Sequence, residues 1–316
     1  MAELRPELLT PDVVETPAWL HRAAIAHAGV DPLALEARRV LFIGMGSSRY
    51  AALNAAAYLR SLGRDAYAEH ASTGAPQPPE EGLLVVAISA GGGSRETIAA
   101  ARRHRGTSTV VGITNRPQSA LASEVDTCLE LHAGEEVSGV ACRTYTNTLA
   151  LLLMMSGIEA RRVAAAADAS AGLINTTGEW LGAAAELVGR RAIHVLAPAE
   201  RIGSAEQSAL MLREVPRIRA DACETGDWSH VDVYLSKLPG IGLVLLRGSG
   251  WEAEVMEWAA SRGCPVVTVG SPLPGAGLDV PVPGGDDPIV RMLAEVRVCE
   301  LLAADLHIRH GDRLSM

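Results

Sequence analysis

Two turns rich in glycine and serine constrain the fold of this chain most strongly. Residues 44–48 (Gly-Met-Gly-Ser-Ser) follow an apolar run at 40–43, and residues 89–94 (Ser-Ala-Gly-Gly-Gly-Ser) follow one at 83–88. A helical pattern begins after each turn, which predicts strand-to-helix junctions of an α/β fold. The free N–H groups of a helix start attract an anion, and small residues let it approach the backbone. Together the turns predict a phosphate site at the carboxyl edge of a parallel sheet, and simple helix capping by serine is the alternative for either turn alone.

The composition indicates that any bound anion is held locally. The chain has 316 residues, of which 48% are hydrophobic, and its formal net charge is −9. Nucleic acids and anionic membranes are polyanions, so this charge argues against either as a partner. The longest apolar run, at 149–155, is too short to span a bilayer. Backbone amides and hydroxyl groups must therefore hold the phosphate.

The cysteines and the start of the chain indicate the cellular compartment. The five cysteines are scattered, without the paired spacing of zinc or redox sites. We therefore expect reduced thiols, no bound metal and no cofactor. The first residues lack the apolar core of a signal peptide, which predicts a cytoplasmic protein.

Strand and helix patterns occur in two series with the same order. The first contains strands at 40–43, 83–88, 109–114 and 127–131. The second contains strands at 192–197, 243–246 and 265–269, with helices at 203–215 and 252–261. The repetition predicts an internal duplication, and thus two tandem doubly wound, flavodoxin-like domains with parallel sheets. His194 lies within an apolar strand and is predicted to be a core residue.

We expect four parts along the chain. They are an N-terminal helical segment at 1–35, a phosphate-binding domain at 36–165, a helical linker at 166–190, and a second domain at 191–316 that ends in a helix. A break at 175–178 (Asn-Thr-Thr-Gly) interrupts the helical pattern before the second domain.

The two copies differ where the chemistry is expected. The second copy has Arg-Gly-Ser-Gly-Trp at 247–251 in place of the serine turn at 89–94, so we expect a phosphate site only in the first copy. The second copy offers Glu214, at the end of a helical pattern, and His230, in a loop. Such a pair can remove a carbon-bound proton and carry a proton to a ring oxygen. Either residue alone is also typical of a solvated surface.

These motifs resemble those of the double sugar isomerase (SIS) domain proteins, in particular the isomerase half of glucosamine-6-phosphate synthase. The resemblance extends from about residue 12 to about residue 311, and it is strongest at 44–48, 89–97, 139–146 and 212–230. It implies two SIS domains and a sugar 6-phosphate as substrate.

The resemblance implies roles for individual residues of the first three blocks. It assigns the phosphate to Ser47, Ser48, Ser89 and Ser94. It places a second group of residues near the sugar: Gly46, Ala90, Gly91, Ala141 and Cys142. Ala90, Gly91 and Gly93 depart from the family pattern Ser-Gln-Ser-Gly-Glu-Thr, which removes side-chain contacts and predicts an enlarged pocket.

The fourth block carries the implied catalytic residues. Glu214 ends a segment similar to the family's Leu-Lys-Leu-Lys-Glu, and His230 follows sixteen residues later in a segment similar to Gly-Glu-Leu-Lys-His. The resemblance makes Glu214 the base and His230 the ring-opening group. In the synthase this histidine comes from the neighbouring subunit, which implies a homodimer with shared active sites.

Two departures from the synthase narrow the expected reaction. No glutaminase domain precedes Val40, and no lysine follows Gly311, so we do not expect a glutamine amidotransferase. The lead hypothesis is a lyase that opens the ring, removes the C2 proton and dehydrates N-acetylglucosamine 6-phosphate. One alternative is an aldose–ketose isomerase or deaminase acting on glucosamine 6-phosphate or a fructosamine phosphate. Another is a sensor that binds a sugar phosphate without turnover.

Overall fold

The structure is a computed structural model that describes residues 4–30, 39–189 and 191–311. It divides into two compact units. The N-unit contains residues 18–135 and 143–164, and the C-unit contains residues up to 17, residues 136–142 and residues from 165 onward. Parts of two expected regions, the N-terminal segment at 1–35 and the tail after Gly311, lie outside the described residues.

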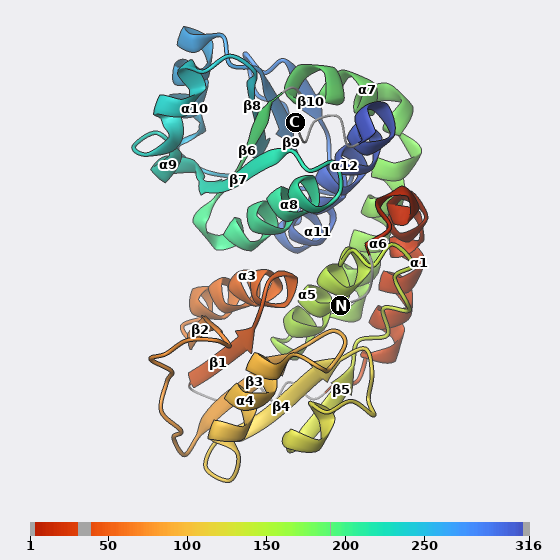
Figure 1. Ribbon diagram of the computed structural model, residues 1–316, viewed down its shortest axis with the longest axis vertical. Coiled ribbons are helices and arrows are strands. Elements are labelled where there is room, and N and C mark those ends of the chain that lie inside the picture. Colours follow the sequence, from red (N-terminus) through yellow and green to blue (C-terminus); the bar gives the residue numbers. More distant parts are fainter. Residues whose placement is uncertain (1–3, 31–38, 190, 312–316) are drawn as a thin grey trace. The chain divides into compact units, whose positions relative to one another are not determined.

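The N-unit is built on a parallel sheet with the strand order β2-β1-β3-β4-β5. The helix α3 (Ser47–Ser61) packs on one face with α5 (Arg143–Met155), and α4 (Arg95–His104) packs on the other (Figure 1). β3 is buried along its whole length, which explains its continuous apolar sequence. The strands are β1 (Arg39–Gly44), β2 (Asp65–His70), β3 (Leu83–Ile88), β4 (Thr109–Thr114) and β5 (Thr127–Glu130).

The C-unit has a second parallel sheet, in the order β10-β9-β8-β6-β7. Read from β7, this is the strand order of the N-unit, with β6 in the place of β1 and β8 in the place of β3. The strands are β6 (Ala192–Ala197), β7 (Arg219–Glu224), β8 (Ile241–Leu246), β9 (Val266–Val269) and β10 (Leu278–Val280).

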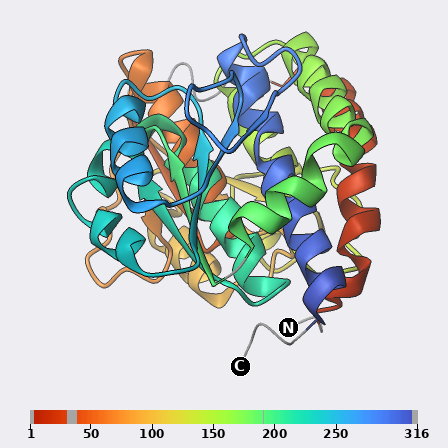
Figure 2. The same cartoon turned by 90° about the horizontal axis from the view of Figure 1, so that it is seen from above.

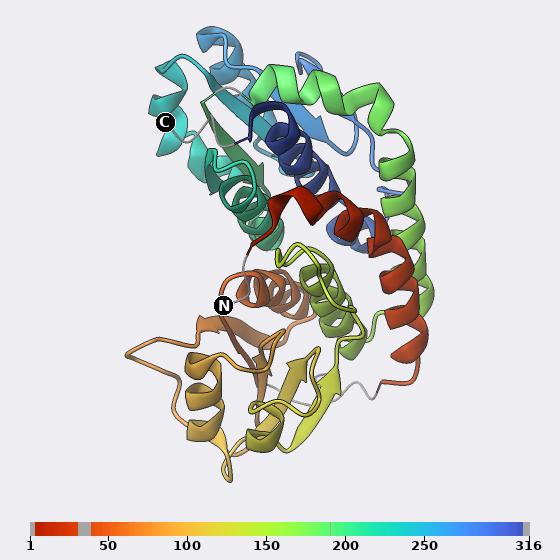
Figure 3. The same ribbon diagram turned by 45° about the vertical axis from the view of Figure 1, so that its right-hand side comes forward.

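Helices cover both faces of the C-unit sheet, as Figure 2 and Figure 3 show. One face carries α7 (Thr177–Val188) and α8 (Ile202–Glu214), with α12 (Val296–His310) packed on them. The other face carries α9 (Thr225–Trp228) and α10 (Glu252–Arg262). α8 follows β6 and leads into β7, so it runs antiparallel to the strands. It begins at the carboxyl edge of the sheet and ends at the amino edge.

The remaining α-helices of the described residues are α1 (Leu9–Ala26), α6 (Ala160–Asn175) and α11 (Pro288–Ala294). The predicted break at 175–178 is confirmed, because α6 ends at Asn175 and α7 begins at Thr177. Within the ranges that the structure describes, no helix is both long and apolar enough to cross a membrane.

The α/β class and every strand named from the sequence are present, within one or two residues at each end. β2, β7 and β10, which lie at the edges of the sheets, are not among the predicted strands. β2 reads Asp-Ala-Tyr-Ala-Glu-His and only its Ala66 is fully buried, so it has no apolar run to reveal it. The expected four-part division into domains stays a prediction.

Gly92, in the turn after β3, has a conformation that requires glycine. Its φ is +64°, and an added Cβ would lie 2.0 Å from Ser119 Oγ. We expect Gly92→Ala to lower the free energy of unfolding by about 1–3 kcal/mol, from backbone strain and the clash together. Urea unfolding measures the effect. Gly93→Ala is the matched control, since a Cβ there meets nothing within 4 Å; equal midpoints for the two variants would refute the prediction.

Candidate active site

The first turn, after β1, presents free amides at the start of α3. Gly46 is the N-cap with φ +50°, and the first helical hydrogen bond runs from Tyr50 N–H to Gly46 O (2.9 Å). The N–H groups of Ser47, Ser48 and Arg49 precede that bond, and the first turn contains no acidic residue. The predicted phosphate ligands Ser47 and Ser48 are therefore the first two residues of a helix whose start favours an anion.

The second turn, after β3, is stabilised by its own serines. Ser89 is buried, and its Oγ accepts a hydrogen bond from Ser94 N–H (3.4 Å). Ser94 is the N-cap of α4, and its Oγ accepts from Thr97 N–H (3.3 Å). The same hydroxyl donates to Glu96 Oε2 (3.0 Å). Ser94 therefore caps the helix, and its hydroxyl is also engaged with the Glu96 carboxylate.

The structure brings these two turns side by side. β1 and β3 are paired neighbours in the N-unit sheet, so both turns leave its carboxyl edge. A Cβ on Gly44 would lie 3.4 Å from Ile88 O and 3.1 Å from Ser48 Cβ. Glycine at this position allows the start of α3 to approach β3. Of the weaker predicted residues, Gly91 is exposed, and Ala90 O accepts hydrogen bonds from Asn115 N–H (2.8 Å) and Thr114 Oγ1 (3.1 Å).

The third block, with Ala141 and Cys142, belongs to the C-unit. Gln207 Nε2 of α8 donates to Ala141 O (2.7 Å), and Cys142 N–H donates to Glu136 Oε1 (2.7 Å). Complete burial raises the pKa of the Cys142 thiol well above its ordinary value, with a further contribution from the Glu136 charge. Cys142 is thus a neutral packing residue, and its N–H is held by the Glu136 carboxylate.

Glu214 is the last residue of α8, seven residues after Gln207 and therefore about two turns along the same helix face. Its carboxylate is half-buried, and desolvation raises its pKa from the ordinary value. Among the described residues, no side chain or backbone group makes a hydrogen bond to it. A carboxylate that is partly desolvated and unpaired is well suited to accept a proton.

His230 is exposed in the loop after α9, and its N–H donates to Asp227 O (2.9 Å). The preceding helix is anchored by the buried Trp228, whose Nε1 donates to His194 Nδ1 of β6 (2.9 Å). Burial lowers the pKa of His194, which keeps that ring neutral as an acceptor. The prediction that His194 is a core residue is confirmed. In the described part of the chain, no hydrogen bond or ion pair joins His230 to Glu214, although both belong to the C-unit.

A buried charged cluster lies near Glu136 and Cys142, and it is not predicted from the sequence. Arg297 and Glu300 of α12 are both fully buried and form an ion pair, and Arg297 Nη1 also lies 3.2 Å from Thr16 Oγ1. Desolvation is the main cause of a rise in the pKa of Glu300 to about 7; the Arg297 charge opposes this rise, and the nearby Glu136 charge contributes to it. The available signal is the pair of charges three residues apart in the otherwise apolar stretch 296–304.

Glu300 makes stability depend on pH. Its pKa is about 7 in the folded chain and 4.5 when it is freely exposed to water, so between these pH values the folded chain keeps a proton that the unfolded chain releases. Stability from this group is complete below pH 4.5 and falls until about pH 7, by about 3 kcal/mol. His27 has the opposite effect on the pH dependence of stability, because burial lowers its pKa to about 4 and its contribution to stability is lost as the pH falls.

Because other groups also titrate, the effect of Glu300 is measured as a difference in the free energy of unfolding between a variant and the wild type. The free energy of unfolding of Glu300→Gln minus that of the wild type is expected to rise by about 3 kcal/mol between pH 4.5 and pH 8. Urea unfolding at several pH values measures it. Parallel stability curves for the two proteins would rule out the assigned role of Glu300.

A separate cavity of about 490 Å³ lies at the amino edge of the C-unit sheet and is lined by Lys237, Arg262 and Cys264 among others. It contains none of the predicted site residues. Within the described residues, no group of three His, Cys, Asp or Glu side chains is arranged to hold a metal ion.

Comparison with known proteins identifies the family. Residues 35–156 match the SIS domain family. An isomerizing glutamine–fructose-6-phosphate aminotransferase from Aeropyrum pernix is 30% identical over 282 residues, covering 81% of this chain and 44% of that relative. The chain spans less than half the length of the curated relatives that it matches most clearly.

Solved structures share the fold at low sequence identity. The tagatose-6-phosphate ketose/aldose isomerase from Escherichia coli superposes with a TM-score of 0.84 at 16% identity, covering 96% of this chain and 93% of that one. The glucosamine-6-phosphate deaminase from Thermotoga maritima gives 0.77 at 19% identity, with coverages of 96% and 95%. Residues 35–156 thus form an SIS domain, and the chain is homologous to the isomerase domain of glutamine–fructose-6-phosphate aminotransferases.

Proposed function

We propose that this chain is an enzyme of sugar 6-phosphates, acting as an aldose–ketose isomerase or a deaminase on an amino sugar. The observation that carries the proposal is the pair of adjoining helix-start turns after β1 and β3, which contain the half-buried Ser47 and Ser48 and the buried Ser89. The named activities of the structural neighbours, an isomerase and a deaminase of sugar 6-phosphates, support it.

The phosphate anchors the substrate in this proposal. The dianion accepts hydrogen bonds from the serine hydroxyls and from the N–H groups that start α3. His230 then opens the ring, by giving a proton to the ring oxygen while the C1 hydroxyl loses one. The product of this step is the open-chain aldehyde, whose carbonyl makes the C2 proton acidic.

Glu214 removes that C2 proton, and the electron pair moves toward C1 and its oxygen. Return of a proton to C1 gives the ketose when C2 carries a hydroxyl group. When C2 carries an amine, protonation at C1 leaves an imine at C2, and water converts it to the ketose and ammonia. The raised pKa of Glu214 suits it to hold the proton between these two steps.

Dehydration of N-acetylglucosamine 6-phosphate, the lead hypothesis from the sequence, has no support among the relatives with named activities. The isomerase or deaminase alternative therefore replaces it. A sensor without turnover is disfavoured by the unpaired Glu214 carboxylate. The second SIS domain, the homodimer with a shared histidine and the cytoplasmic location remain parts of the proposal.

A panel of sugar 6-phosphates tests the reaction. Glucosamine, N-acetylglucosamine, fructosamine and neutral hexose 6-phosphates are incubated with the protein, and ketose, aldose and ammonia are measured. We expect ketose from an aldose or a 2-amino sugar, or aldose from fructosamine phosphate, with equal ammonia if the substrate is an amine. Thermal stabilisation by a sugar phosphate without any product would instead favour the sensor, and an unsaturated product would restore the dehydratase.

A further inference from the structure

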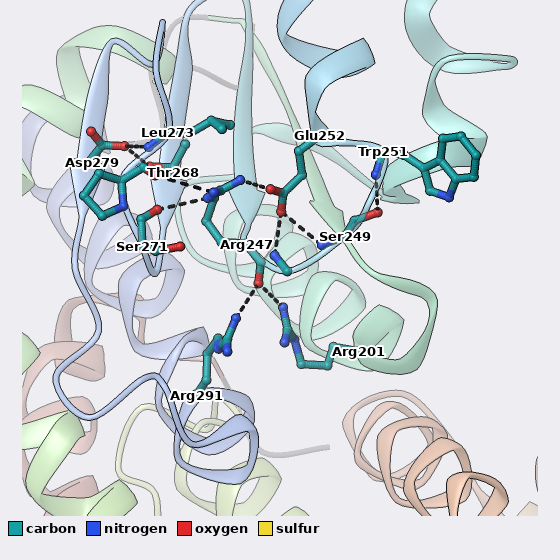
Figure 4. Close-up of polar contacts among 12 residues, drawn as sticks. Arg201, Arg247, Ser249, Trp251, Glu252, Thr268, Ser271, Leu273, Asp279 and Arg291 are labelled. Atoms are coloured by element: carbon teal, nitrogen blue, oxygen red, sulfur yellow. Dashed lines mark hydrogen bonds and ion pairs between the residues drawn. The ribbon is translucent and has the colours of Figure 1, made fainter.

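Three arginines converge on the loop that follows β8 in the C-unit. Arg201 Nη2 and Arg291 Nη1 (3.2 Å) both donate to the carbonyl oxygen of Arg247, as Figure 4 shows. A Cβ on Gly248 would lie 3.1 Å from Arg291 Nη1 and 3.2 Å from Arg201 Nη2. Both guanidinium groups therefore approach the loop closely, from α11 and from the turn after β6.

The carboxylate of Glu252 accepts hydrogen bonds from the backbone amides of the same loop. Glu252 Oε1 accepts hydrogen bonds from the N–H groups of Gly248 (2.5 Å) and Ser249 (3.0 Å), and Glu252 also forms an ion pair with Arg247. Two successive amides and an arginine are the kind of partners that bind a phosphate oxygen. The loop therefore has the form of an anion site in which Glu252 supplies the anion.

Two of the three arginines around this loop form direct ion pairs. Arg201 pairs with the fully buried Glu295 (3.2 Å), and Arg247 pairs with Glu252. Arg291 has no carboxylate within ion-pair distance in the described ranges, and its buried Nε has no hydrogen-bond partner. Desolvation lowers the pKa of Arg247, the Asp279 charge opposes that effect, and the Arg291 charge adds to it. Desolvation raises the pKa of Glu295, and the Arg201 and Arg291 charges oppose that rise, although Arg291 and Glu295 form no direct ion pair. Among the described residues, Arg291 is thus the arginine of this cluster that makes no direct carboxylate contact.

The position of the loop strengthens this reading. β8 holds the place in the C-unit sheet that β3 holds in the N-unit sheet, so residues 247–251 correspond to the serine turn at 89–94. Arg201 lies in the turn after β6, which corresponds to the turn after β1. Arginine side chains thus stand where the N-unit uses hydroxyl groups. Glu214 ends α8 at the opposite edge of the same sheet.

We infer that Arg201, Arg247 and Arg291 form a second anion site, which takes the phosphate group of a small molecule at the carboxyl edge of the C-unit sheet. Glu252 is its internal competitor, because it holds the amides of Gly248 and Ser249 that an incoming phosphate would use. The lack of a serine turn in the second copy predicts no phosphate site there, whereas the donors in this loop are guanidinium groups and amides. The inference is independent of the reaction at Glu214.

Binding of inorganic phosphate and of glucosamine 6-phosphate to the whole chain tests the inference by calorimetry. The Ser48→Ala/Ser89→Ala background removes serine hydroxyls of the first site, so the remaining binding reports the second. In that background we expect Arg291→Ala to weaken phosphate binding at least tenfold, and Glu252→Gln to strengthen it about tenfold. Arg309→Ala, which removes an exposed arginine of α12 paired with Asp305, is the matched control.

Two results would overturn the inference. One is the absence of phosphate binding in both the Ser48→Ala/Ser89→Ala background and its Glu252→Gln derivative, each shown to be folded by its unfolding midpoint. The other is residual binding that falls equally with Arg291→Ala and Arg309→Ala, which would indicate a general effect of charge. Neither result bears on turnover, because ketose and ammonia formation are measured separately with the serines intact.

Discussion

Replacement of Glu214 by glutamine is expected to lower kcat by about 10²–10⁴-fold, with little change in binding of the sugar phosphate. Glutamine has the same shape but cannot accept the C2 proton. The unpaired, half-buried carboxylate at the end of α8 is the group for which this change matters most. Initial rates of ketose or ammonia formation, with binding measured by calorimetry, give kcat and affinity separately.

Glu206→Gln is the matched control for this variant. Glu206 lies on the same helix near its start and undergoes the same chemical change. We expect it to retain wild-type kcat. Acid–base catalysis contributes at least about a hundredfold to the rate. If Glu214→Gln keeps more than about a tenth of the wild-type kcat, the loss is too small, and Glu214 is not the base.

Removal of the hydroxyls of Ser48 and Ser89 together is expected to raise KM for a sugar 6-phosphate by about 10²–10⁴-fold. Each hydrogen bond to a charged group contributes about 1.5–3 kcal/mol, and the two serines lie on different turns. The phosphate is remote from C2, so kcat is expected to change little. Steady-state kinetics of Ser48→Ala/Ser89→Ala measure both quantities.

Two controls separate phosphate binding from damage to the fold. Ser61→Ala removes a hydroxyl at the far end of α3, where it donates to Tyr58 O (2.7 Å), and should leave KM unchanged. The dephosphorylated sugar should bind the double variant and the wild type equally weakly. An unchanged KM in the double variant, with its unfolding midpoint preserved, would contradict the assigned role of the two turns.

The sheet core could be predicted because its signals are local. β3 and β8 are continuous apolar runs, and the glycines of the turn at 44–48 mark the end of β1. The adjacency of the two turns followed from the rule that parallel strands end at one sheet edge, and the close approach of Gly44 to Ile88 O agrees with it. The edge strand β2 escaped prediction because its outer face is polar.

Contacts between distant segments could not be predicted in the same way. The hydrogen bond from Gln207 to Ala141 O joins residues 66 positions apart, and neither residue type suggests the other. The occupation of the loop amides by Glu252 also depends on the fold of that loop, since the residue resembles any acidic residue in a first helical turn. Such interactions are set by tertiary packing rather than by a repeating pattern.

The fate of the C2 proton tests the central claim most directly. Each sugar 6-phosphate that stabilises the protein is incubated in deuterium oxide, and the C2 proton signal is followed by nuclear magnetic resonance. The account predicts that this signal is lost with the wild-type chain and with Glu206→Gln, and that it persists with Glu214→Gln over the same time. A C2 proton that remains with the wild-type chain for every sugar phosphate that binds would contradict it.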